Sequence, residues 1–170
     1  MENTQFGARL NSFKLGLVQS EIEEAGNLTL ALLKRASKAG LTCADLNFPD
    51  HFSNLEVQKL KNFLSQNKIN INGLAMRYYT SPKFKLGAFT NPEKAVRQLA
   101  IDETKKGIDL AASLNCETMT LWMGQDGLDY SFQADFSKMW DYTITAMQEI
   151  ADHNKNINIS IEYKPNEPRA

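Results

Sequence analysis

The fold prediction rests on the run NINISIEYK, residues 156–164. Apolar and polar residues alternate along it, which is the pattern of a β-strand whose two faces meet different surroundings. One face carries Ile157, Ile159, Ile161 and Tyr163, and the other carries Asn158, Ser160, Glu162 and Lys164. A strand in an open parallel sheet, covered by helices on both sides, is apolar on both faces. The alternation therefore argues against an open sheet of that kind.

Strand-like and helix-like segments follow one another along the whole chain. We expect strands at residues 13–18, 41–48, 69–79, 117–123 and 156–163, and helices at 27–39, 53–67, 91–114 and from about 135 onward. Asn27, the capping-box pattern SNLE at 53–56 and the sequence NPE at 91–93 mark helix starts. Repeated strand–helix units indicate a parallel α/β protein. With the one-sided polarity of the last strand, they predict a partial (β/α)8 TIM barrel of about five strands with their helices.

Polar residues gather on one face of three predicted strands. The second strand places Cys43, Asp45 and Asn47 together, and the fourth places Thr118, Thr120 and Trp122 together. Glu162 would be a carboxylate in a confined place, which is costly unless it is paired or bound to a metal. Lys164 on the same face is one available partner, so a structural Glu–Lys pair and a functional site both remain open. The three strands together favour a shared site at their carboxyl ends.

Composition limits the class of protein. The chain has 170 residues, 42% apolar and 23% charged, with a formal net charge of −1, and we expect one domain over residues 1–170. Without a surplus of Lys and Arg, no nucleic-acid partner is expected. No phosphate-loop or GxGxxG pattern occurs in the sequence. The polar start, the two separated cysteines and the lack of a span-length apolar run predict a reduced, cytoplasmic protein that does not enter a membrane.

The stretch IEYKPNEPR, residues 161–169, resembles the motif I-E-P-K-P-N-E-P-R of the xylose isomerase family of (β/α)8 barrels. Residues 81–127 are similar to that family's stretch ending in a W-G-G-R-E-G turn, and FKLGL and AGLTCADLNFPD show weaker similarity. The sequence E-Y-K-P, residues 162–165, is also similar to a motif in barrels of the L-rhamnose isomerase type. The resemblance implies that the chain is the N-terminal part of such a barrel.

The resemblance also implies a metal-dependent sugar isomerase that interconverts an aldose and a ketose, with two Mg²⁺ or Mn²⁺ ions in a complete site and a homo-oligomer in the full-length form. It assigns metal ligation to Glu162 and Glu167 and catalytic roles to Lys164 and Asp50. Hard cations take carboxylate oxygens, which suits the two glutamates. Substrate contacts fall on residues from three different strands: Trp122, Tyr79 and Asn47.

The sequence departs from the family pattern at several positions. Asn47 and Ser81 stand where the family has histidines, and Val18 stands where it has a tryptophan, which points to a monosaccharide other than xylose. Five strands supply too few ligands for a two-metal site, so we expect the chain alone to be inactive. A non-catalytic sugar-binding or assembly module is therefore the alternative. An apurinic endonuclease-like hydrolase is disfavoured, because it needs a histidine-rich zinc site and the chain has two histidines.

Overall fold

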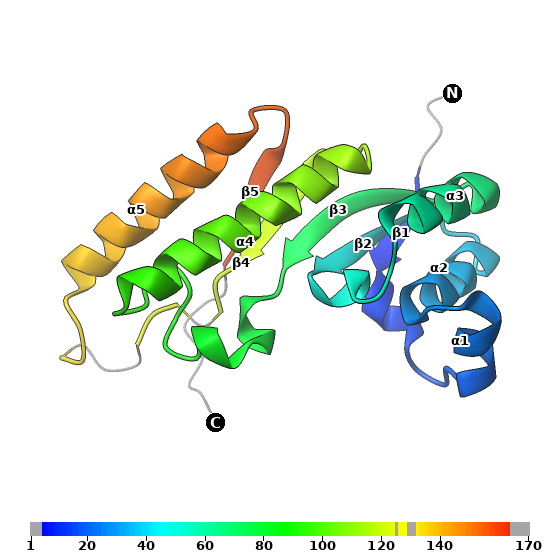
Figure 1. Cartoon of the computed structure of the whole chain (residues 1–170), viewed down its shortest axis with the longest axis horizontal. Coiled ribbons are helices and arrows are strands. Elements are labelled where there is room, and N and C mark those ends of the chain that lie inside the picture. The colour runs from blue at the N-terminus through cyan, green and yellow to red at the C-terminus, as the bar shows by residue number, and fades with distance from the viewer. Residues whose placement is uncertain (1–4, 125, 129–131, 164–170) are drawn as a thin grey trace.

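The computed structural model describes residues 5–124, 126–128 and 132–163. Its five strands form one parallel sheet in the order β1-β2-β3-β4-β5 (Figure 1). The strands are β1 Gly7–Arg9, β2 Cys43–Phe48, β3 Asn70–Met76, β4 Thr118–Trp122 and β5 Asn158–Glu162. A doubly wound sheet reverses its strand order at a switch point, whereas a barrel keeps sequence order. The order confirms the predicted partial TIM barrel.

Helices connect successive strands. The α-helices are α1 Gln19–Ala25, α2 Leu28–Lys38, α3 Val57–Asn67, α4 Lys94–Ser113 and α5 Phe136–His153. Short 3-10 helices are η1 Leu10–Phe13, η2 Asp50–Phe52, η3 Tyr78–Thr80 and η4 Pro82–Phe84. Figure 1 shows α4 and α5 running side by side over β4 and β5. Within the described ranges, no helix is long and apolar enough to cross a membrane.

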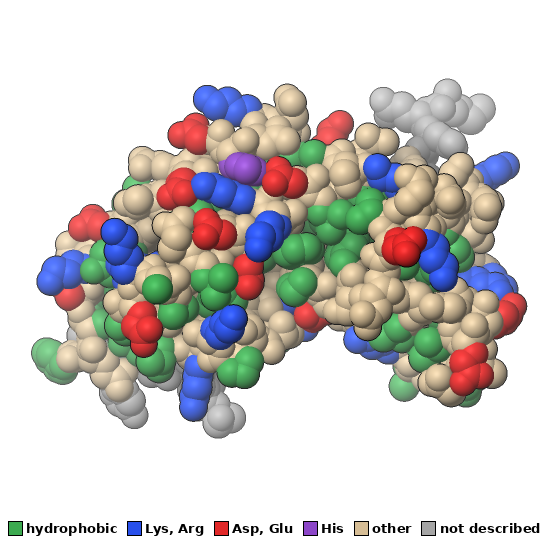
Figure 2. All heavy atoms as spheres, in the orientation of Figure 1, with side chains coloured by type: hydrophobic (Ala, Val, Ile, Leu, Met, Phe, Trp, Pro, Cys, Tyr) green, Lys and Arg blue, Asp and Glu red, His purple; other side chains and the backbone are tan. Residues whose placement is uncertain are grey.

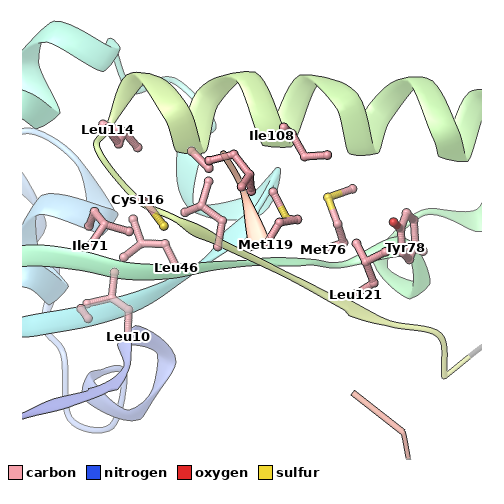
Figure 3. Packing of buried hydrophobic residues seen from close by; sticks show 14 of the residues in the cluster. Leu10, Leu46, Ile71, Met76, Tyr78, Ile108, Leu114, Cys116, Met119 and Leu121 are labelled. Atoms are coloured by element: carbon pink, nitrogen blue, oxygen red, sulfur yellow. The ribbon is translucent and has the colours of Figure 1, made fainter. Parts of the chain in front are cut away.

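One face of the sheet packs against the helices and forms the core. Leu46, Leu74 and Met119 stand opposite one another on neighbouring strands and are fully buried. Figure 3 shows Met119 beneath helix α4, close to Ile108. The helix approaches closely because Gly107 faces the sheet, where an added Cβ would lie 2.8 Å from Met119 Cε. This face accounts for the apolar half of each alternating strand.

The opposite face is the inner face of the partial barrel. The strand registers place on it the residues with the opposite parity: Asp45, Asn47, Thr118, Thr120, Trp122, Asn158, Ser160 and Glu162. Most of them are partly or fully exposed, in contrast to the buried core face. The predicted division of the strands into an apolar and a polar face is therefore confirmed.

The sheet is strongly curved. Arg9 at the end of β1 donates hydrogen bonds from Nη2 to both carboxylate oxygens of Glu162 at the end of β5, at 3.0 and 2.9 Å. Three strands lie between these two in the sheet. In a flat sheet the edge strands would be about 19 Å apart, from four spacings of about 4.8 Å, more than the two side chains span together. The contact therefore requires the arc of a barrel.

The strand predicted at residues 13–18 is wrong. The first strand is Gly7–Arg9, and the predicted segment continues η1 into a turn that leads to α1, a helix that was not predicted. Arg35 explains the difference, because its guanidinium donates to the carbonyls of Phe13, Leu15 and Gly16 at 3.3, 2.9 and 2.8 Å. These carbonyls therefore have partners outside the sheet.

One of the predicted helix starts has the expected cap, because Asn27 Oδ1 accepts from Thr29 N at 2.8 Å at the start of α2. The start predicted at Asn91 is displaced: α4 begins at Lys94 after Glu93, which makes no side-chain cap, and the Asn91 side chain accepts from Glu93 N at 3.0 Å in the turn before the helix. The capping box at residues 53–56 is wrong, because α3 begins at Val57 without a side-chain cap.

Helix α5 differs from the prediction that its sequence supports. Helical spacing predicts that one stripe packs in the core, made of Phe136, Met139, Trp140, Thr143, Met147 and Ile150. Ile150 is buried as expected, but the Trp140 side chain is 67% exposed. Figure 2 shows acidic and basic side chains intermingled over α4 and α5. Lys105 Nζ lies 2.6 Å from Glu149 Oε1 and ties the two helices together.

Candidate active site at the carboxyl ends of the strands

The structure brings several predicted site residues to one end of the sheet. Asn47, Trp122 and Glu162 lie at or near the carboxyl ends of β2, β4 and β5, while Asp50 and Tyr79 lie in the 3-10 helices that follow β2 and β3. Trp122 and Glu162 are direct partners in the register between β4 and β5. In parallel barrels this end is where binding and catalytic groups collect.

Two aromatic rings form a wall at this end. The Tyr79 and Trp122 rings meet edge to face, with centroids 4.7 Å apart and an interplanar angle of 89°. The Arg77 guanidinium lies over the Tyr79 ring at 4.4 Å from the centroid, a cation–π geometry. Both rings are partly exposed, so a ligand can reach them. The sequence predicted the two aromatic residues but not Arg77.

Asp126 holds the segment after β4 in place. Its Oδ1 accepts from Ala88 N at 3.1 Å, from Thr90 N at 2.7 Å and from the Thr90 hydroxyl at 2.8 Å. Burial raises the pKa of this carboxyl. The segment that follows Trp122 is therefore tied to the loop before α4. From the sequence, Asp126 is predicted only to be a turn residue after the fourth strand.

His51 stabilises the end of β2. Its Nδ1 accepts from Asn47 N at 2.9 Å, so the ring proton lies on Nε2, which is 3.0 Å from Asn11 Oδ1. Burial and the positive charge of Lys14 lower its pKa to about 4. From the sequence alone, the position of His51 after the second predicted strand is compatible with a surface loop or with a site residue. The structure shows a buried, neutral side chain that fixes the strand carrying Asn47.

Asp50 precedes His51 in the chain and is exposed. Its Oδ1 accepts from the Thr80 hydroxyl at 3.3 Å, which links the turn after β2 to the turn after β3. The carboxylate therefore stands at the rim of the site, near the loop that carries Tyr79.

Of the two predicted metal ligands the structure describes Glu162. Glu167 and the predicted catalytic residue Lys164 lie outside the described residues. Both carboxylate oxygens of Glu162 accept from Arg9. Within the described ranges, no group of three or more His, Cys, Asp or Glu residues is placed to hold a metal ion. These residues by themselves do not form a metal centre. Arg9 was missed, because nothing local marks a contact across 153 positions.

Comparison with structures of known proteins agrees with the barrel geometry. A D-allulose 3-epimerase from Methylomonas sp., in complex with D-allulose, aligns with a TM-score of 0.66 at 17% identity, over 92% of this chain and 50% of that one. A D-tagatose 3-epimerase-like protein gives 0.68 at 16% identity, over 97% and 55%. The IOLI protein with a zinc atom gives 0.61 at 11% identity, over 93% and 51%. At these identities the likeness establishes the fold.

Sequence comparison is more specific. The xylose isomerase from Thermus thermophilus is 30% identical over 117 residues, which cover 66% of this chain and 30% of the relative. The xylose isomerase from Thermus caldophilus is 27% identical over 117 residues with the same coverage. The chain thus matches about 30% of the length of these relatives. The family model of the xylose isomerase-like TIM barrel matches residues 33–169. The chain therefore belongs to the xylose isomerase-like TIM barrel family.

Proposed function

We propose that this chain contributes the first five strands of a metal-dependent sugar isomerase that interconverts an aldose and a ketose. The observation that carries the proposal is the position of Glu162 beside Trp122 on the inner face, with Tyr79 packed against the tryptophan. A carboxylate next to an aromatic wall suits a sugar, which presents both hydroxyl groups and an apolar ring face. The family supports the same class of substrate.

Each predicted site residue has a role in this proposal. Trp122 and Tyr79 cover the apolar face of the sugar and exclude water from the reacting carbons. Lys164 donates a hydrogen bond to the substrate oxygen, and Asp50 and Asn47 bind hydroxyl groups at the rim. Mg²⁺ or Mn²⁺ stabilises negative charge on the substrate oxygens when bound. Glu162 and Glu167 are the ligands that this chain offers, and the remaining ligands must come from outside residues 1–170.

The experiment is an isomerase assay on the full-length protein that contains this chain, with Mn²⁺ and a panel of aldoses. We expect Trp122→Ala to lower kcat/KM about five- to 150-fold, since an aromatic wall contributes roughly 1–3 kcal/mol to binding a ring. Trp140→Ala is the matched control, because this second tryptophan is exposed on α5, and its kcat/KM should not change. If folded, Mn²⁺-loaded protein converts none of the aldoses, the isomerase proposal is wrong.

A second candidate is a sugar-binding module without catalysis. The observation that favours it is the pairing of Glu162 with Arg9, which occupies the carboxylate that a metal would need. Sugar titrations followed by tryptophan fluorescence separate the two candidates. Binding that requires Trp122, in a full-length protein that turns over no sugar, would support the module instead of the enzyme.

A further inference from the structure

We propose that Arg9 is a cation built into the site that competes with a divalent metal ion for Glu162. The inference rests on the proposed function, which makes Glu162 a metal ligand. It adds a residue from β1 that controls when this ligand is available. The contact itself is direct: Nη2 of Arg9 lies 3.0 and 2.9 Å from the two carboxylate oxygens.

The guanidinium contacts both of the carboxylate oxygens that Glu162 would offer to a metal ion. Arginine stays protonated in proteins, so the positive charge of Arg9 is permanent. A divalent ion bound to the same oxygens would lie within a few Å of this charge, and the two would repel each other. Metal binding at Glu162 therefore requires Arg9 to move away from the carboxylate.

The surroundings allow this movement. The side chains of Arg9 and Glu162 are 66% and 37% exposed, so the ion pair is partly solvated and its contribution to stability is small. Asp45 is the register partner of Arg9 on β2 and shares the inner face. Its Oδ1 already accepts from Asn72 Nδ2 at 2.9 Å, which holds the carboxylate in position. A displaced Arg9 thus has a second carboxylate on the neighbouring strand.

The size of the effect follows from these facts. The Arg9–Glu162 ion pair is partly exposed, and water and salt screen the repulsion between Arg9 and a metal ion. Each of these interactions therefore changes the Mn²⁺ binding constant by a small factor. We expect Arg9→Gln to tighten Mn²⁺ binding about three- to tenfold. Arg9→Lys keeps the charge, so its affinity should stay within about twofold of the original protein. Glu162→Gln in the Arg9→Gln background should weaken binding at least about tenfold, because a carboxylate oxygen is lost.

The test is a Mn²⁺ titration of the full-length protein that contains this chain, at fixed ionic strength, with free Mn²⁺ measured by electron paramagnetic resonance. The protein and the three variants are compared, and their circular dichroism and urea midpoints establish that each is folded. Arg9→Gln binding equal to or weaker than that of the original protein would overturn the inference, and so would an absence of saturable binding in that variant. Since no sugar is present, failure of the isomerase proposal is measured separately. Tight Mn²⁺ binding without turnover leaves the competition intact.

Discussion

Acidification is expected to destabilise the fold through His51. This side chain is 3% exposed, and its Nδ1 already accepts a hydrogen bond from Asn47 N. A proton added at Nδ1 would set two N–H groups against each other inside the protein. Burial is the largest cause of the lowered pKa, the charges of Lys14 and Arg77 lower it further, and Asp50 opposes them.

The magnitude follows from linkage. The pKa of His51 falls from 6.5 in the unfolded chain to about 4 in the folded protein. The unfolded state therefore takes up the proton first. Stability is unaffected above the unfolded pKa and is lost as the pH falls through the window between the two values. The loss amounts to about 2 kcal/mol between pH 7 and pH 5 and about 3 kcal/mol by pH 4. This loss is a measurable fraction of the free energy of unfolding of a typical domain, which is about 5–15 kcal/mol.

Urea unfolding at pH 7 and pH 5 measures the loss. His51→Asn removes the titrating ring and keeps an acceptor for the Asn47 amide, so its free energy of unfolding should change about 2 kcal/mol less than that of the original protein. His153→Asn is the control, since this second histidine lies at a partly exposed contact with Asp109. Acidic groups titrate alike in all three proteins and cancel in the difference. Equal losses in the original protein and His51→Asn, within about 0.5 kcal/mol, would refute the reasoning.

Three further predictions concern the scaffold. Gly87 has φ +104° and an added Cβ would lie 2.6 Å from a hydroxyl oxygen, so Gly87→Ala should cost about 1–3 kcal/mol in urea unfolding, and a neutral result would contradict this geometry. Leu74→Ala in the core should cost about 2–5 kcal/mol, whereas Leu15→Ala, 92% exposed, should stay within about 0.5 kcal/mol; similar losses would place the core elsewhere. Arg35→Lys should raise the pKa of Glu21 from about 2 towards 4.5, and an unchanged NMR titration would show that Arg35 is not its cause.

The part of the fold that could be predicted is the part with a repeating pattern. The alternation along residues 156–163 gave the two faces of β5 because side chains of a strand point in turn to the helices and to the interior. β1 could not be found this way, because three residues are too few to show a period. The apolar run at 13–18 resembles a strand in its composition. Its carbonyls are bound by Arg35, which lies in a helix about 20 residues later, and no local pattern reveals this contact.

The site was predicted less completely, for a physical reason. Trp122 and Glu162 end their strands and Tyr79 follows β3, so their approximate place was implied once the strands were assigned. Their partners were not, because Arg9 reaches Glu162 through the curvature of the sheet and not through any local spacing. The Trp140 error has a related origin: helical periodicity identifies an apolar stripe, but the number of neighbouring elements decides how much of it is covered.

The Arg9–Glu162 pair also bears on how a complete barrel would be built. In a ring of eight strands, the first and fifth stand opposite each other. The contact between β1 and β5 therefore crosses the interior and does not lie along a seam where further strands must pair. Three more strands can join the free edges of β1 and β5 without breaking it. Closing the ring would then enclose Arg9 and reduce its exposure to water, which strengthens both its attraction to Glu162 and its repulsion of a metal ion. The competition for Glu162 should accordingly be stronger in a closed barrel than in the open arc.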